Sequence, residues 1–157
     1  VQKNDVRDTA ESGLKGTALN GVAMVANSFT NCGTDKKPVI TISSNSMLCL
    51  IQDNVVKLGQ GDGIRVDGDD NQVFDNVVAD CLEDGIDVSG GSDNKIEDNV
   101  IQRCHGEGIE NNGSDTDCEE NVMSQNRIDL ANDGSFDNFD GNEFDTGGPG
   151  FAPQIDD

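Results

Sequence analysis

The feature that most constrains the fold is a repeat of about 22 residues that runs through the chain. The stretches that begin at Gly61, Glu83 and Gly106 read GDGIRVDGDDNQVFDNVVADC, EDGIDVSGGSDNKIEDNVIQRC and GEGIENNGSDTDCEENVMSQN. One asparagine marks the same place in every repeat: Asn4, Asn27, Asn54, Asn76, Asn99, Asn121 and Asn142. The spacings of these asparagines are 23, 27, 22, 23, 22 and 21 residues. A period of this size is typical of a solenoid.

Apolar residues keep their register with this asparagine, because the positions three before it and two after it are apolar in every repeat. The apolar residues alternate in short bursts, which indicates β-strands, and Gly, Asn and Asp fill the gaps as turn formers. Strands at this spacing bring like residues together only if they stack in parallel, ~4.8 Å apart. The sequence therefore predicts an all-β protein: a right-handed parallel β-helix solenoid with about six to seven coils of ~22 residues.

The repeat also predicts how the ends and the core are built. The length of 157 residues suits one domain, and we expect the β-helix over residues 1–146 and a C-terminal tail over 147–157. Four phenylalanines near the C-terminus predict an aromatic plug: Phe136, Phe139, Phe144 and Phe151. We expect the asparagines to form a buried hydrogen-bonded ladder at a turn with left-handed backbone. Cys32, Cys81 and Cys104 recur at one position of the repeat, and we expect them to be buried thiols without a disulfide.

The charge restricts the partners. The chain carries 31 acidic and 10 basic residues, a net charge of −21, so we do not expect it to bind nucleic acid. No apolar run is long enough to predict a membrane span. Because the first repeat is already in register at its first residue, we expect the N-terminal coil to be covered either by sequence missing from this chain or by another chain in end-to-end contact.

The repeats resemble the right-handed parallel β-helix proteins of the pectate-lyase-like superfamily, in their C-terminal portion. The matching motifs are DGI-x-V at 62–66 and 84–88, EGI at 107–109, and DN-V-[VI] at 75–78 and 98–101. The resemblance implies an extracellular or cell-surface protein that contacts polysaccharide. Lyases, polygalacturonase-like hydrolases, uronan epimerases, phage tailspikes and non-catalytic surface proteins share such coils. DGID at 84–87, followed one coil later by CHGEG, is similar to the hydrolases, but their paired Asp is missing.

One outward ladder carries the candidate catalytic residues. The residue after the isoleucine that begins each strand points outward, which stacks Arg65, Asp87, Glu110 and Asp129 on successive coils. Carboxylates ~5 Å apart suit a retaining glycosidase, and their mutual repulsion raises one pKa, as acid catalysis requires. His105, the single histidine, completes this candidate site. The alternative is a solvated surface, because outward ladder positions are polar in solenoids generally.

Calcium is the candidate cofactor. The segment DGDDN places Asp67, Asp69 and Asp70 around a turn glycine, and carboxylates are the ligands that Ca²⁺ prefers. Turn chemistry alone also accounts for acidic residues beside glycine.

Three functions remain open from the sequence. The first is a secreted or surface β-helix module that binds polysaccharide without strong catalysis of its own. The second is a polysaccharide lyase or glycoside hydrolase acting on an acidic polysaccharide. The third is a structural or self-assembling solenoid element. Aromatic platforms would favour carbohydrate binding, and Phe74 is the one plausible exposed aromatic residue.

Overall fold

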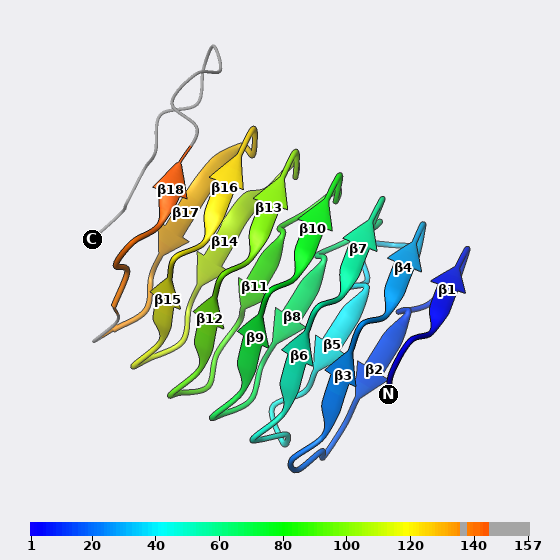
Figure 1. Cartoon of the computed structure of the whole chain (residues 1–157), viewed down its shortest axis with the longest axis horizontal. Coiled ribbons are helices and arrows are strands. Elements are labelled where there is room, and N and C mark those ends of the chain that lie inside the picture. Colours follow the sequence, from blue (N-terminus) through cyan, green and yellow to red (C-terminus); the bar gives the residue numbers. More distant parts are fainter. Residues whose placement is uncertain (136–137, 145–157) are drawn as a thin grey trace.

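The chain forms a parallel β-helix of about six turns in a computed structural model, with coils about 23 residues apart. The structure describes residues 1–135 and 138–144. Successive coils lie side by side along one axis (Figure 1), an arrangement consistent with a right-handed parallel β-helix. The predicted fold is therefore confirmed. Within the described residues there is no helix, and so none long and apolar enough to cross a membrane.

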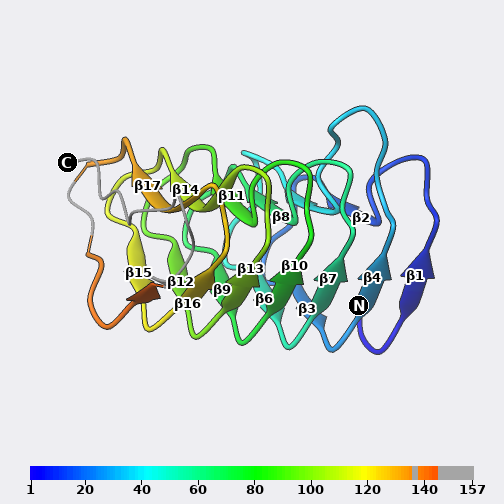
Figure 2. The ribbon, with the colours of Figure 1, turned by 90° about the horizontal axis from the view of Figure 1, so that it is seen from above.

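Each complete coil contributes one short strand to each of three parallel sheets. Sheet 1 contains β1 (Asp5–Arg7), β4 (Ser28–Thr30), β7 (Val55–Lys57), β10 (Val77–Ala79), β13 (Val100–Gln102), β16 (Val122–Ser124) and β18 (Glu143–Phe144). Sheet 2 contains β2 (Leu14–Gly16), β5 (Ile40–Ile42), β8 (Ile64–Val66), β11 (Ile86–Val88), β14 (Glu107–Asn111) and β17 (Ile128–Asn132). Sheet 3 contains β3 (Ala23–Val25), β6 (Leu50–Gln52), β9 (Gln72–Phe74), β12 (Lys95–Glu97) and β15 (Asp117–Glu119). Sheets 1 and 3 form one face of the solenoid and sheet 2 the opposite face (Figure 2).

The core is a set of columns of like residues, because parallel strands in register place equivalent side chains one above another. On sheet 1 the central residues of β7, β10, β13 and β16 stack inward as Val56, Val78, Ile101 and Met123, all fully buried. Every strand in this part of the chain therefore adds one layer of apolar side chain to a continuous core.

The asparagine ladder is confirmed by its hydrogen bonds. From Asn4 to Asn142, each side-chain Nδ2 donates to Oδ1 of the asparagine on the next coil, at 2.9 to 3.1 Å. The same Oδ1 also accepts the backbone N–H of the preceding asparagine at 3.0 Å. A second, shorter ladder lies at the corner between sheets 2 and 3, where Asn71 donates to Asn94. This second ladder was not predicted from the sequence.

Left-handed backbone occurs at three corners of the coil, but not at the ladder asparagines themselves. The residue before the asparagine has the positive φ: Lys3, Ala26, Asp53, Asp75, Asp98 and Glu120, between 52° and 56°. The prediction that the asparagine adopts this conformation is therefore wrong by one residue. The asparagine instead supplies hydrogen bonds that stabilise the corner, and these offset the strain of the left-handed residue before it.

The cysteines and the C-terminal coil follow the predictions where the structure describes them. All five cysteines lie within the described residues, are buried, and form no disulfide. Phe139 and Phe144 pack partly buried against the core. Phe136, Phe151 and the predicted domain boundary at residue 146 lie outside the described residues.

Candidate functional site

The predicted outward ladder on sheet 2 is present for three of its four members. Strand pairing places Asp87 beside Arg65 on one side and beside Glu110 on the other. The same row continues towards the N-terminus as Thr41 and Lys15. Sheet 2 therefore presents cationic residues near its N-terminal end and carboxylates towards its C-terminal end.

Asp129 does not join this ladder, and that prediction is wrong. Glu110 pairs with Ala131, and Glu107 pairs with Ile128. The physical reason is that the segment between Asn126 and β17 is one residue shorter than its counterpart in the preceding coil, so the strand register moves by one residue. The side chain of Asp129 is consequently buried.

Asp87 lies on the outer side of its strand but is covered by its neighbours. It is only 5% exposed. The Ser89 hydroxyl donates to its Oδ2 at 2.5 Å, and the Arg65 guanidinium lies 3.3 Å from the same atom. Its Oδ1 is buried without a hydrogen-bond partner. Burial raises the pKa of Asp87, although Ser89 and Arg65 oppose the change. Asp87 faces outward, as predicted, but it is buried by its neighbours.

A second carboxylate row lies beside the first, and the sequence analysis did not assign it a role. Asp62, Asp84 and Glu107 occupy equivalent positions in successive coils. Asp62 Oδ1 accepts the backbone N–H of Asp84 at 3.3 Å, and Asp84 Oδ1 accepts that of Glu107 at 2.6 Å. These residues are the acidic members of the DGI and EGI motifs, so the motif itself was the available signal.

The glycine of the motif is required by close approach between coils. A Cβ on Gly63 would lie 2.6 Å from the carbonyl oxygen of Gly85, and a Cβ on Gly85 would lie 2.6 Å from that of Gly108. Real Cβ atoms do not approach a backbone oxygen so closely, so a side chain here would force the coils apart. The glycines therefore bring the carboxylates of the second row close together.

The second row contains carboxyl groups whose pKa values are pushed apart. Burial and the nearby charge of Asp87 raise the pKa of Asp62 to about 6. Burial and a hydrogen bond to the Glu107 side chain raise the pKa of Asp84 to about 8. Burial opposes the ionisation of Glu107, but hydrogen bonds from Asp84 and Arg127 outweigh it and lower the pKa of Glu107. At neutral pH, Asp84 is thus a protonated acid that donates to an ionised Glu107.

His105 lies apart from the ladder it was predicted to complete. It is exposed and lines a pocket of about 470 Å³ with Arg103, Cys104, Gln125 and Arg127. Arg103 holds Asp80 through two hydrogen bonds of 2.7 and 2.9 Å. None of the three ladder residues lines this pocket, so the structure does not bring the four predicted catalytic residues together.

A cationic pocket lies at the N-terminal end of the sheet 2 row. Its volume is about 330 Å³, and it is lined by Glu11, Ser12, Lys15, Lys37, Pro38, Thr41 and Arg65. Three of the ten basic residues of the chain thus line one hollow. One of them, Lys37, belongs to the segment GTDKKP at residues 33–38, within the long interval of 27 residues between Asn27 and Asn54. Lys37 forms an ion pair with Glu11 there, and Arg65 forms ion pairs with Asp67 and Asp87.

The predicted calcium ligands have other structural roles. Asp67 Oδ1 accepts a hydrogen bond from Arg65 at 2.9 Å, and Asp69 Oδ1 accepts the backbone N–H of Ser92 at 3.0 Å. Asp70 is exposed at a left-handed corner. Across residues 1–135 and 138–144, no three His, Cys, Asp or Glu side chains are arranged to hold a metal ion. The structure therefore does not support the calcium site.

Comparisons with known proteins bear on the family rather than on the site. A solved structure named Geobacillus virus E2 - ORF18 matches 98% of this chain with a TM-score of 0.45 and 16% sequence identity. The chain spans 37% of the length of that protein. No curated protein matches the chain. Residues 1–145 match the family described as "Periplasmic copper-binding protein (NosD)". Because this match covers nearly the whole sequence, the chain belongs to the NosD family.

Proposed function

We propose that the chain binds an acidic polysaccharide along the outer face of sheet 2, without strong catalysis of its own. The observation that carries this proposal is a pocket in which Lys15 lies beside Lys37 and Arg65 on a protein whose net charge is −21. Lys37 and Arg65 share their charge with acidic neighbours. A cationic hollow on such a surface selects carboxylates against a background that repels them, and charge-assisted hydrogen bonds hold them there. Lys15 forms no ion pair within the described part of the chain, so its ammonium group is available to a ligand.

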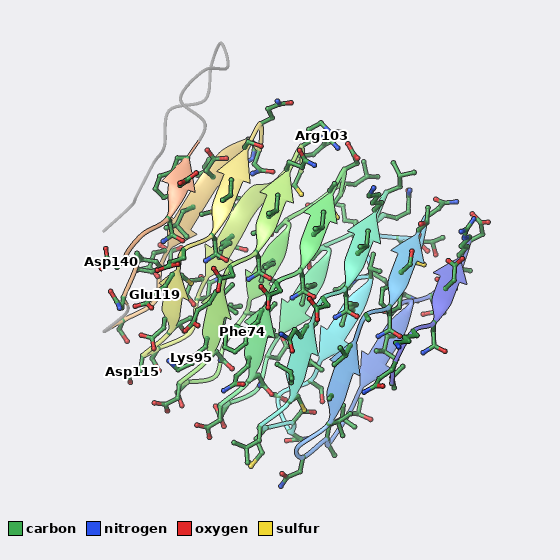
Figure 3. The ribbon with its side chains drawn as sticks, in the orientation of Figure 1. Phe74, Lys95, Arg103, Asp115, Glu119 and Asp140 are labelled. Atoms are coloured by element: carbon green, nitrogen blue, oxygen red, sulfur yellow. The ribbon has the colours of Figure 1, made fainter. Side chains whose placement is uncertain are left out.

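The regular spacing of the coils supports a polymeric ligand. Strands ~4.8 Å apart repeat at about the length of a sugar unit, so a chain lying along the axis meets a new coil with nearly every unit. Phe74, the one plausible aromatic platform, is half-buried on the outer side of sheet 3, where it pairs with Glu97 (Figure 3). It lies on the face opposite sheet 2 and therefore does not contribute to this site.

Affinity measurements with polygalacturonate test this proposal. We expect Lys15→Gln combined with Lys37→Gln to weaken binding about tenfold, because two charge-assisted contacts are lost. Lys57→Gln is the matched control, since Lys57 is exposed like Lys15 but lies on sheet 1, and we expect its effect to be less than about twofold. Equal binding of a fully methyl-esterified, uncharged polymer would contradict the proposal, as would an unchanged affinity of the double variant.

Hydrolysis of the same polysaccharide is the second candidate function, favoured by the Asp84–Glu107 pair. A protonated carboxyl beside an ionised one supplies an acid and a base within one site, which is the arrangement that glycoside hydrolysis uses. The pair is hydrogen-bonded, however, and therefore closer than the carboxylates that flank a scissile bond in most glycosidases. For that reason we place binding first.

Release of new reducing ends from polygalacturonate tests the second candidate. We expect Asp84→Asn to abolish any release, because the amide cannot donate an acidic proton. Glu83→Gln is the neighbouring control: its carboxylate forms an ion pair with Lys36 rather than with the second row, and it should retain activity. Activity that survives Asp84→Asn would remove this pair from the reaction.

Copper is suggested by the description of the family, but the side chains of this chain do not fit a copper site. Copper sites in proteins are built from imidazole, thiolate and thioether ligands. His105 lies beside two arginines, the cysteines are buried in the core, and Met24 and Met123 are buried with them, which leaves Met47 as the one exposed thioether of the three. No cluster of three or more His, Cys, Asp or Glu exists among the described residues. We therefore assign no role here to copper.

The NosD family is periplasmic by description, which places this chain outside the cytoplasm. We propose that it meets polysaccharide there or at the cell surface. End-to-end contact through the N-terminal coil stays a prediction, and it would also serve a self-assembling element. Sedimentation at several concentrations tests this contact, because assembly through a coil edge depends on concentration.

A further inference from the structure

A row of outward-facing valines on sheet 1, two of them exposed and two half-buried, runs parallel to a row of exposed acids, and the fold itself requires neither row. The valine row consists of Val55, Val77, Val100 and Val122, which pair directly across β7, β10, β13 and β16. Val100 and Val122 are 39% and 38% exposed. The acidic corner row consists of Asp53, Asp75, Asp98 and Glu120, each exposed and two residues before one valine. The valine row lies on sheet 1, and the acidic corner row lies where the chain passes from sheet 3 to sheet 1, so both belong to the face that these two sheets share (Figure 2).

The solenoid itself does not require these residues. The first two coils use Lys3 and Ala26 at the same left-handed corner. They use Asp5 and Ser28 at the position of the valines. An acid at the corner and a valine on the strand therefore occur together on four adjacent coils, although the backbone accepts other residues at both positions. A contiguous apolar row beside uncompensated charge is a feature of interaction surfaces.

The acidic corner row carries charge that its surroundings do not neutralise. No lysine or arginine forms an ion pair with any of its four members in the described part of the chain. Asp75 accepts a hydrogen bond from Gln52 at 3.0 Å, which leaves its charge in place. Four carboxylates at the ~4.8 Å spacing of parallel strands repel one another, and a cationic partner would relieve this repulsion.

We propose that the valine row and the acidic corner row together dock a basic amphipathic α-helix of a partner protein. The spacing favours a helix over an extended strand. One helical turn advances 5.4 Å, close to the ~4.8 Å between coils, whereas like-facing residues of a strand are about 6.7 Å apart. Apolar side chains on one stripe of the helix contact the valines, and its lysines or arginines lie over the acids. Nucleic acids and anionic lipids are repelled by the same acids.

A synthetic helix of leucine and lysine, about 15 residues long with leucine at i, i+3 and i+4, is the probe. Its binding is measured by calorimetry at physiological salt, beside a peptide of the same composition in scrambled order. We expect the amphipathic peptide to bind at least about tenfold more tightly than the scrambled one, because only it presents a continuous apolar stripe.

Matched variants locate the surface. Val77→Thr with Val100→Thr keeps the strand propensity, and Asp75→Asn with Asp98→Asn keeps a residue that tolerates the left-handed corner. We expect each pair to weaken binding about tenfold. Asp70→Asn with Asp93→Asn is the control: it removes two charges from another left-handed corner, one that lacks a valine row, and we expect less than about a twofold change.

Thermal melting of each variant verifies that the fold is retained. Equal binding of the scrambled peptide, or equal losses from the two charge pairs, would reduce the interaction to general attraction and overturn the proposal. Failure of the amphipathic peptide to bind would overturn it as well. None of these outcomes depends on whether sheet 2 binds polysaccharide, because the valine row and the acidic corner row lie on the opposite face.

Discussion

Asn99→Ala is expected to lower the free energy of unfolding by about 4 kcal/mol. The side chain of Asn99 takes part in five hydrogen bonds. Its Nδ2 donates to the backbone carbonyls of Val73 and Glu97 and to Asn121 Oδ1. Its Oδ1 accepts hydrogen bonds from the backbone N–H and the side-chain Nδ2 of Asn76. Alanine leaves these partners buried and unpaired, which costs about 1–3 kcal/mol for each unsatisfied group that cannot reach water.

Chemical denaturation of wild type and variant measures this loss. Asn112→Ala is the control: Asn112 is exposed at a turn, and we expect its effect to stay within about 0.5 kcal/mol. A loss of less than about 1 kcal/mol for Asn99→Ala would mean that the ladder is not a cooperative element of the fold. Wild type and variants are compared at one pH, because stability also depends on pH.

The free energy of unfolding is expected to fall as pH rises from about 4 to about 8. The pKa of Asp84 is about 8 in the folded chain, raised by burial and by its hydrogen bond to Glu107, whereas an unfolded aspartate has a pKa of about 3.9. Between these values the folded state holds a proton that the unfolded state has lost, so stability decreases with pH. The slope is at most about 1.4 kcal/mol per pH unit for one such group. Asp62, with a pKa of about 6, adds to the decrease below that pH.

Asp84→Asn isolates this contribution. The amide resembles the protonated acid and does not ionise, so we expect the variant to be more stable than wild type at pH 8.5. The gain should be about 2 kcal/mol rather than the full linkage, because Asp84 is only half-buried and solvent screens its charge. Near pH 4 the two proteins should have similar stability.

Asp93→Asn is the control for the pH series, since Asp93 is exposed at a left-handed corner where asparagine is tolerated. Its stability should follow the wild-type curve at every pH. A wild-type stability that does not change between pH 5 and 8, or an Asp84→Asn variant with the same slope as wild type, would show that Asp84 is ionised in the folded state.

The fold could be predicted from the sequence because, in a solenoid, the period of the sequence repeat determines which residues of neighbouring strands pair. The ladder asparagines and the apolar columns recur at one spacing, and parallel stacking is the arrangement that brings like residues together. The stacking of Arg65, Asp87 and Glu110 followed from the same register and is confirmed. The resemblance to parallel β-helix proteins was correct for the fold.

The site could be predicted only in part, because side-chain burial and local register depend on neighbours that a period does not reveal. Asp87 is outward by register, yet Arg65 and Ser89 cover it. The register of β17 changes because one residue is missing between Asn126 and Leu130. The ladder asparagines give the length of each repeat, but they do not show where within the repeat a residue is missing. The pKa of Asp84 is raised by burial and by its hydrogen bond to Glu107, and neither can be recognised from an aspartate in the sequence.

The buried cysteines have a consequence for how the solenoid comes apart. Their thiols are spread along the axis, from the coil of Asn27 to that of Asn121: Cys32, Cys49, Cys81, Cys104 and Cys118. An oxidant or alkylating reagent in the periplasm reaches each sulfur only when its own coil opens. Since coils are held mainly by their nearest neighbours, opening proceeds from an end inward. The order in which the five sulfur atoms react therefore records the direction in which the stack unzips.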